Sequence, residues 1–257
     1  MGRVMRGLQD KPVIVTGGAS GIGKAIAMRL GEEGCKVGIF DLNEAGAAAV
    51  ADEIQKSNGV AHAYKVDITD YAAVSSAVDE FEKMAGPVFG LINNAGWDEA
   101  KPFIQTELDL WKKVIDINLY GPLNLTHVLG RRMAERGAGR VVSISSDAGR
   151  VGSSGEAVYS AAKGGIIAFM KTMGREFAKQ GITFNTICPG PTDTPLLASV
   201  DAAGGGRLVG ALTKAIPMRR LAQPADYPGM AAFFLSDDAS FITGQTVSVS
   251  GGLSMHG

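Results

Sequence analysis

Short apolar runs rich in valine and isoleucine alternate along this chain with longer segments in which apolar residues recur at helical spacing. The pattern predicts seven strands, at Val13–Val15, Lys36–Phe40, Ala61–Val66, Val88–Ile92, Arg140–Ile144, Thr183–Ile187 and Thr246–Val249. Between them it predicts helices around Ile22–Leu30 and at Glu44–Gln55, Tyr71–Met84, about Leu108–Ala134 and about Ala157–Ala178. Such alternation is typical of an α/β fold in which helices cover both faces of a doubly wound parallel sheet.

The order of elements also predicts where a ligand would bind. Right-handed connections place the C-terminal ends of parallel strands at one edge of the sheet, where such folds bind their ligands. One segment, at about residues 192–224, breaks the alternation and contains several prolines and a run of three glycines. An insertion of that length in a compact domain more often covers a site than remains unstructured. We therefore expect residues 1–257 to form one domain with a small lid over its site.

The charge balance excludes several classes of partner. The chain has 25 Lys and Arg against 26 Asp and Glu, so no basic surplus indicates binding to nucleic acid or to an anionic membrane. Its start lacks the apolar region of a signal peptide, and no apolar run approaches the length of a membrane span. Two cysteines and three scattered histidines match neither a disulfide framework nor a zinc site. We expect a soluble, cytoplasmic protein without a bound metal.

A glycine-rich turn follows the first predicted strand, with Gly17, Gly21 and Gly23 at its key positions. Glycine lets backbone N–H groups approach a diphosphate at the start of a helix, where the helix dipole favours an anion. The same residues nearly match the phosphate loop of nucleotide hydrolases, but Ala25 stands where that loop needs a metal-binding hydroxyl. The loop therefore favours a dinucleotide over a hydrolysed nucleotide, although an ordinary strand-to-helix turn would look similar.

Asp41 makes the dinucleotide reading more specific. It ends the second predicted strand, and its distance from the glycine turn suits a carboxylate that binds the ribose hydroxyls of an adenosine. That carboxylate would repel a 2′-phosphate, and the glycine turn contains no Arg or Lys to attract one. We therefore predict NAD rather than NADP as the cofactor. Taken alone, Asp41 could also cap the helix that begins at Glu44.

Tyr159 and Lys163 lie four residues apart in a predicted helix, so both side chains project from one face. A phenol has an ordinary pKa of about 10, too high for ready proton transfer at neutral pH. An adjacent ammonium would lower that pKa, which makes the pair a candidate acid–base unit. A Tyr and a Lys at this spacing are more often a solvated surface pair, so other residues must support the assignment.

Five motifs in a fixed order supply that support. They are Thr16-Gly17 with Gly21-Ile22-Gly23, Asn93-Asn94-Ala95-Gly96, Ser146, Tyr159-Ser160-Ala161-Ala162-Lys163 and Pro189-Gly190. Together they resemble the short-chain dehydrogenase/reductase family over essentially the whole chain, which implies a Rossmann fold and an oxidoreductase. The position of Ser146 relative to Tyr159 matches the family's serine, whereas Ser145 does not.

The resemblance implies a role for each matching residue. Tyr159 would exchange a proton with the reacting oxygen, Lys163 would tune Tyr159 and hold the nicotinamide ribose, Ser146 would bind the substrate oxygen, and Asn118 would hold a relay water. The expected cofactor-binding residues are Gly17, Ser20, Gly21, Ile22, Gly23, Asp41, Asp67, Ile68, Asn94, Ala95, Gly96, Tyr159, Lys163, Pro189, Gly190, Thr192 and Thr194. Asn118 could instead be a buried amide bonded to backbone.

The expected substrate-binding residues are Trp97, Ser146, Val151, Ser153, Glu156, Tyr159 and Leu196, a mixed polar and apolar wall. Within the family, several stretches resemble members that oxidise a ring hydroxyl β to a coenzyme A thioester with NAD⁺. Lys101, Lys214, Arg219 and Arg220 are candidates for contacts with coenzyme A phosphates, although exposed basic residues usually face solvent.

Three alternatives remain open. The chain could reduce a 3-oxoacyl group carried on a carrier protein or coenzyme A, a reaction that in the family usually uses NADPH, or oxidise a free cyclic alcohol or diol. It could also sense a dinucleotide without catalysis, although the intact Tyr159 and Lys163 disfavour that. Family members are commonly tetramers, so we expect a homotetramer with residues 251–257 near a subunit interface.

Overall fold

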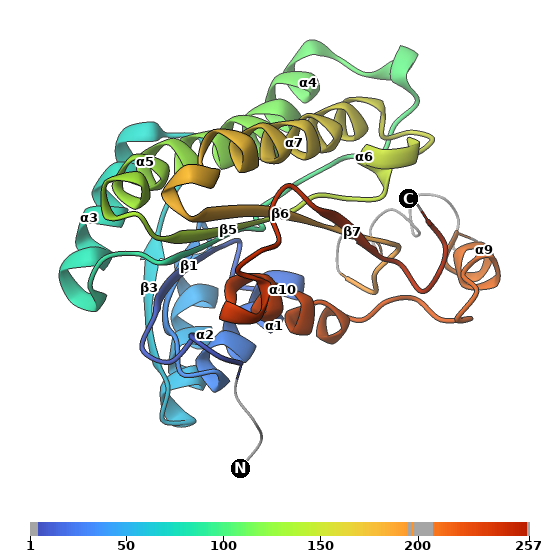
Figure 1. Cartoon of the computed structure of the whole chain (residues 1–257). Helices are drawn as coiled ribbons and strands as arrows, with labels where there is room; N and C mark the ends of the chain where they lie inside the picture. The colour runs from blue at the N-terminus through green and yellow to red at the C-terminus, as the bar shows by residue number, and fades with distance from the viewer. Residues whose placement is uncertain (1–4, 195–196, 198–207, 256–257) are drawn as a thin grey trace.

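A computed structural model of the chain describes residues 5–194, 197 and 208–255. It is a single α/β domain built on a seven-stranded parallel sheet with the order β3-β2-β1-β4-β5-β6-β7 (Figure 1). The strands are β1 Pro12–Thr16, β2 Lys36–Asp41, β3 Val60–Lys65, β4 Gly90–Asn93, β5 Gly139–Ile144, β6 Ile182–Pro189 and β7 Thr246–Val249. The helices are α1 Gly21–Glu32, α2 Glu44–Lys56, α3 Tyr71–Ala85, α4 Leu108–Ile115, α5 Gly121–Arg136, α6 Ala148–Val151, α7 Ala157–Glu176, α9 Leu208–Ala215 and α10 Pro228–Leu235.

The predicted doubly wound α/β fold is confirmed, and all seven expected strands are present in one parallel sheet. Their observed ends differ from the predicted ends by one or two residues, because hydrogen bonding and not hydrophobicity defines where a strand stops. The sheet reverses its direction of growth between β1 and β4, which pair side by side although two strands and three helices separate them in sequence. A crevice for ligands is expected at that switch point.

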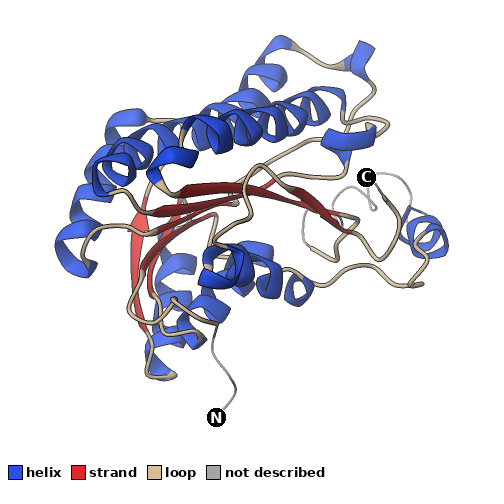
Figure 2. Cartoon of the chain, in the orientation of Figure 1, coloured by secondary structure: helices blue, strands red, loops and turns tan. Residues whose placement is uncertain are grey.

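Helices cover both faces of the sheet, as Figure 2 shows, and each face has its own apolar core. The helices α1, α2 and α10 pack on one face, and α3, α5 and α7 pack on the other. Successive residues of a strand point to opposite faces, so Val13 and Val15 enter the first core and Ile14 enters the second. This double burial explains why the strands read as continuous apolar runs.

The single helix expected at about Leu108–Ala134 is wrong, because a π-helical turn at Asp116–Tyr120 divides it into α4 and α5. Pro122 lies just after the turn and has no N–H, so it cannot donate the helical hydrogen bond to the carbonyl of Asn118. The backbone N–H of Gly121 donates instead to the carbonyl of Asp116, five residues earlier. Pro122 was the available signal for this break in the sequence.

Part of the predicted lid lies outside the described residues. Of the segment 192–224, the structure describes 192–194, 197 and 208–224, which include α9. Within the described part of the chain, no helix combines the length and apolar character needed to cross a membrane.

Candidate active site

A cleft of about 1170 Å³ runs along the C-terminal edge of the sheet. Its wall is formed by segments that immediately follow six strands, β1 to β6, together with the starts of α1 and α7. Residues widely separated in sequence therefore meet in one crevice, as the strand order requires. Sixteen of the predicted cofactor residues line it: Gly17, Ser20, Gly21, Ile22, Asp41, Asp67, Ile68, Asn94, Ala95, Gly96, Tyr159, Lys163, Pro189, Gly190, Thr192 and Thr194.

The glycine turn forms an open cradle at the start of α1. Gly17 and Gly21 have positive φ angles of 63° and 55°, which only glycine adopts without strain. A Cβ added at Gly21 would meet only the methyl group of Thr194, at 4.0 Å, so a ligand can approach the backbone there. Ser20, the N-cap of α1, makes no side-chain capping bond, which leaves the first N–H groups of the helix available to an anion. This cradle fits a dinucleotide diphosphate.

The Asn93–Gly96 motif holds the glycine turn in place. The backbone N–H groups of Asn94 and Ala95 donate to Thr16 Oγ1, at 3.0 and 3.1 Å, and Asn94 Nδ2 donates to the carbonyl oxygens of Thr16 and Gly17. These bonds join the ends of β1 and β4 at the switch point of the sheet. The motif thus supports the cofactor loop as well as lining the cleft.

Gly23 is a correction to the predicted cofactor set, because it does not line the cleft. A Cβ added there would lie 2.1 Å from the carbonyl oxygen of Gly17 and 2.4 Å from Asn94 Nδ2. Gly23 is therefore needed for the close approach of α1 to the turn and makes no wall for a ligand. A glycine spacing in sequence does not distinguish these two demands.

Asp41 lies at the end of β2 with both carboxylate oxygens fixed. Its Oδ2 accepts from the backbone N–H of Ala19 at 3.0 Å, and its Oδ1 accepts from the backbone N–H of Asn43 at 2.9 Å. Each oxygen retains a lone pair, and the side chain lines the cleft beside the glycine turn. Asn43, and not Asp41, caps α2, since its side chain accepts from the backbone N–H of Gly46. The carboxylate therefore fits two ribose hydroxyls.

Tyr159 and Lys163 extend from α7 into the cleft on the same face of the helix. The Nζ atom of Lys163 lies 5.5 Å from the centre of the Tyr159 ring and donates to the carbonyl of Ile144 at 3.0 Å. Lys163 is buried, whereas Tyr159 is partly exposed to the cleft. The pair predicted from sequence spacing is thus assembled beside the glycine turn and is not a solvated surface pair.

The expected acidic phenol is not what the structure shows. Burial raises the pKa of Tyr159, the charges of Glu156 and Asp98 raise it further, and a hydrogen bond with Ser146 lowers it. Burial also lowers the pKa of Lys163 to about 8, so the charge expected to stabilise a phenolate is itself weakened. The sequence argument considered the ammonium alone and could not include the cost of burying both groups.

Ser146 and its neighbour Ser145 follow β5 but have different surroundings. Ser146 lines the cleft, and its Oγ accepts from the backbone N–H of Ala148 at 3.1 Å, which leaves its O–H free to donate. Ser145 Oγ is buried and donates to the carbonyl of Lys163 at 2.8 Å. Ser145 therefore anchors α7 to the sheet, and Ser146 is available to a ligand.

The side chain of Asn118 does not line the cleft. Its Nδ2 donates to the carbonyl oxygens of Trp97 at 2.6 Å and Val114 at 2.9 Å, and its Oδ1 accepts from the backbone N–H of Trp97 at 3.4 Å. The amide is fully buried and fully bonded to backbone, which is the structural alternative raised above. A Cβ at Gly96 would lie 2.9 Å from Asn118 Oδ1 and 3.3 Å from Lys163 Nζ, so Asn118 supports the turn against which Lys163 packs.

The predicted substrate residues Trp97, Val151, Ser153 and Glu156 line the opposite part of the cleft, and Leu196 lies outside the described residues. The Nζ atom of Lys113, which the sequence did not single out, lies 3.5 Å above the centre of the Trp97 ring. The tail residues 253–255 and Leu212 of α9 also line the cleft. No motif marked these residues, because packing from distant segments and not local spacing brings them there.

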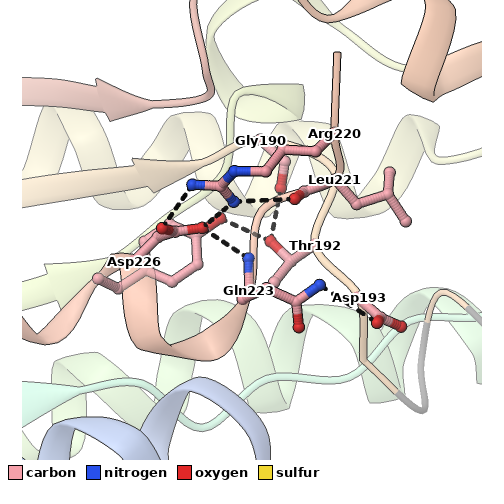
Figure 3. A network of polar contacts seen from close by, with 8 residues as sticks. Gly190, Thr192, Asp193, Arg220, Leu221, Gln223 and Asp226 are labelled. Atoms are coloured by element: carbon pink, nitrogen blue, oxygen red, sulfur yellow. Dashed lines mark hydrogen bonds and ion pairs between the residues drawn. The ribbon is translucent and has the colours of Figure 1, made fainter. Parts of the chain in front are cut away.

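A polar network fixes the segment after β6, as Figure 3 shows. The hydroxyl groups of Thr192 and Tyr227 lie 2.6 Å apart, and Thr192 Oγ1 also donates to the carbonyl of Gly190 at 2.8 Å. Arg220 forms a two-pronged ion pair with Asp226, with distances of 2.6 and 2.8 Å. Arg220 is thereby committed to this network, so the interpretation of it as a free cation for coenzyme A phosphate is wrong.

The described residues contain no group of three or more His, Cys, Asp or Glu side chains that could hold a metal ion. Both cysteines are buried thiols, and burial raises the pKa of Cys188 to about 11. A thiol held in this state is a poor nucleophile.

Comparisons with known proteins agree with this geometry. The family model described as enoyl-(acyl carrier protein) reductase matches residues 17–254. The chain is 38% identical over 244 residues to an acetoacetyl-CoA reductase of Shinella zoogloeoides, covering 95% of this chain and 98% of that protein. It is 39% identical over the same length to an acetoacetyl-CoA reductase of Rhizobium meliloti (strain 1021), with the same coverage. It is 34% identical over 247 residues to nodulation protein G of Azospirillum brasilense, covering 96% of this chain and 99% of that protein. With its parallel sheet, glycine cradle and Tyr159–Lys163 pair, the chain belongs to the short-chain dehydrogenase/reductase family.

Proposed function

We propose that this chain interconverts a secondary alcohol and a ketone with NAD as the hydride acceptor, on a substrate that is an acyl thioester. The observation that carries the proposal is the meeting, in one cleft, of a glycine cradle, the Asp41 carboxylate and the Ser146–Tyr159–Lys163 group. A dinucleotide-sensing protein would need only the first two. The hydroxyl groups of Ser146 and Tyr159, directed at one space, are suited to a reacting oxygen.

When bound, the nicotinamide ring accepts or returns a hydride at the carbinol carbon. In alcohol oxidation, Tyr159 takes the hydroxyl proton, the carbon–hydrogen bond breaks toward the ring, and the carbon–oxygen bond becomes a carbonyl. In ketone reduction, Tyr159 returns the proton to the oxygen. Ser146 donates a hydrogen bond to that oxygen in both directions and orients it toward Tyr159.

Lys163 and Asn118 have supporting roles in this proposal. The Lys163 ammonium, in contact with the turn at Gly96, would bind the nicotinamide ribose and modulate the acidity of Tyr159. Asn118 fixes the backbone of Trp97, and through it the wall on which both halves of the cleft meet. We assign Asn118 to positioning, because its amide hydrogens are bonded to the backbone carbonyls of Trp97 and Val114.

NAD is proposed over NADP because of the charge at the ribose end of the cleft. Asp41 presents a carboxylate there. The cations that line the cleft among the described residues, Lys113 and Lys163, lie elsewhere, in α4 and α7. A 2′-phosphate beside Asp41 would meet repulsion without a compensating cation.

For the substrate, we propose a ring hydroxyl β to a coenzyme A thioester. The stretches Asn93–Asp98 with Lys101–Phe103, Arg150–Tyr159, Cys188–Thr194 and Phe241–Gln245 resemble 2-hydroxycyclohexane-1-carboxyl-CoA dehydrogenase. The acyl-CoA reductases among the relatives act on a ketone with the same relation to the thioester, as the name acetoacetyl-CoA states. That shared chemistry supports an open-chain 3-oxoacyl thioester as the second candidate.

A panel of substrates tests these proposals. Purified protein is assayed for NAD⁺ and NADP⁺ reduction with 2-hydroxycyclohexane-1-carboxyl-CoA, its free acid, 3-hydroxybutyryl-CoA and free cyclic alcohols. The ring thioester with NAD⁺ is expected to give the highest kcat/KM. A preference for 3-hydroxybutyryl-CoA would select the second candidate, and equal use of the free acid would remove coenzyme A from the proposal.

We further propose that the protein is a homotetramer, as the family resemblance implies. Sedimentation equilibrium is expected to give four times the mass of the 26.7 kDa chain, and a monomer mass would contradict this.

A further inference from the structure

Asp98 is a buried carboxyl that the proposed reaction does not use. It is 9% exposed, and its Oδ2 is inaccessible to solvent with no hydrogen-bond partner among the described residues. It directly follows Trp97, whose backbone is fixed by Asn118, so the carboxyl cannot move far toward water. Burying a charge without a partner is costly, and such residues usually persist for a functional reason.

A buried cation lies in the same region. Lys163 is 4% exposed, and within the described part of the chain no carboxylate forms an ion pair with it. Its hydrogen bond to the Ile144 carbonyl leaves the positive charge uncompensated. The negative charge of Asp98 raises the pKa of Lys163, against the larger opposing effect of burial.

Tyr159 experiences the same carboxyl in the opposite sense of function. Glu156, which precedes α7 and lines the cleft, and Asp98 from the segment after β4 both disfavour the phenolate. The Cys188 thiol on β6 has a smaller effect in the same direction, and Ser146 after β5 opposes them. Lys113 of α4 and Asp147 after β5 are the remaining charged groups that line the cleft near this point among the described residues.

We propose that Asp98 is the counter-charge of the Tyr159–Lys163 pair: its carboxylate keeps a proton on both side chains around neutral pH, with Glu156 adding to this at the tyrosine. Asp98 is thus a positioning residue for protons and not a group that contacts the substrate. The inference rests on the proposed acid–base role of Tyr159 but concerns the ligand-free protein.

The charges explain why one carboxyl serves both groups. A nearby negative charge stabilises an ammonium and destabilises a phenolate, so each effect favours the protonated form. Without Asp98, burial would bring the pKa of Lys163 from about 8 toward neutrality. The site would then lose the cation proposed to hold the ribose at the pH where it works. Asp98 carries a cost for this, because burial and the charge of Glu156 raise its own pKa to about 6.

Carbon-13 NMR of protein labelled at tyrosine Cζ, lysine Cε and aspartate Cγ tests the proposal without substrate or cofactor. Tyr159→Phe, Lys163→Met and Asp98→Asn assign the three signals. In Asp98→Asn the titrations of both Lys163 and Tyr159 are expected to move to lower pH by at least about half a unit. Unmoved titrations would overturn the proposal. So would an Asp98 signal in the native protein that titrates at the ordinary value of about 4, a result that needs no folded variant.

Two further variants separate the charge effect from other causes. Glu156→Gln is expected to move the Tyr159 titration and to leave Lys163 nearly unchanged, since Glu156 is not among the causes of the Lys163 shift. Glu99→Gln removes an exposed carboxyl next to Asp98 and is the matched control, expected to move neither. An equal shift in Glu99→Gln would reject a specific role for Asp98.

Kinetics then link the titrations to turnover. With the best substrate of the panel, Asp98→Asn is expected to move the pH profile of kcat/KM to lower pH by the same amount, with KM nearly unchanged at the pH optimum. A raised KM with an unmoved profile would show that Asp98 contacts substrate, against the proposal. If the native protein turns over no alcohol or ketone, the proposed function fails, while the NMR titrations still decide the role of Asp98.

Discussion

Two aspartates at the edge of the sheet show how differently the two halves of the cleft are built. In the cofactor half, each oxygen of Asp41 accepts a backbone hydrogen bond, from Ala19 and Asn43. In the substrate half, Asp98 has a buried oxygen without a partner among the described residues. The first half is a satisfied scaffold whose geometry the backbone dictates, whereas the second retains an uncompensated charge beside the reactive side chains. Binding precision and chemical reactivity are therefore located in different halves.

Tyr159→Phe gives the largest expected effect and tests whether chemistry and cofactor binding separate as this comparison requires. Removing the hydroxyl removes the proton donor and acceptor, so kcat should fall by about 10² to 10⁴-fold. The Kd for NADH, measured by fluorescence titration, should remain within about twofold, because the cradle and Asp41 are untouched. Ser145→Ala is the matched control for a lost hydroxyl outside the cleft. Undiminished turnover in Tyr159→Phe would reject the assigned acid.

Gly23→Ala tests the rigidity of the cofactor half. The added methyl group would lie 2.1 Å from the Gly17 carbonyl oxygen, and the backbone must shift to accept it. We expect a loss of about 3 kcal/mol in the free energy of unfolding, measured by urea denaturation. Gly229→Ala in α10, where nothing lies within 4 Å of the added methyl, should instead stabilise the fold by about 0.5–1 kcal/mol. Equal stabilities would show that the glycine turn tolerates the displacement of α1.

Most of the cofactor half could be predicted from the sequence, because its residues follow strands and their spacing is local. Gly17, Asp41 and Asn94 line the cleft as expected. Gly23 was misassigned since a glycine needed for packing and one needed for ligand access look alike in sequence. The break at Asp116–Tyr120 was missed, although Pro122 marked it.

The substrate half was less predictable because distant segments build it. The sequence identified Trp97 and Glu156, but Lys113 and the tail at 253–255 reach the cleft only through tertiary packing. The direction of the Tyr159 pKa was also wrong, since it depends on burial and on two carboxyls from separate elements. Spacing along a helix predicts which side chains meet but not the dielectric environment in which they meet.

Asp41→Ser sharpens the comparison from the cofactor side. The variant removes both the proposed ribose contact and the charge that repels a 2′-phosphate, so the ratio of kcat/KM for NAD to that for NADP should fall by about tenfold or more. Asp70→Ser, which changes a capping carboxylate of α3, is the control and should leave the ratio unchanged. Equal use of NAD and NADP by the native protein would contradict the role proposed for Asp41.

Asp98→Asn gives the smallest expected effect, and its sign distinguishes the two aspartates. Burial raises the pKa of Asp98 to about 6 in the folded protein, above the value of about 4 in an unfolded chain. The folded state therefore binds the proton more tightly, and its stability declines as the pH rises from about 4 to about 6. Asparagine has no charge to bury, so the variant should gain about 1–2 kcal/mol in the free energy of unfolding at pH 7 and nothing below about pH 4. Urea denaturation at both values measures this. A loss of stability at pH 7 would mean that the Asp98 carboxylate is satisfied in the folded protein, and the two halves of the cleft would then be built alike.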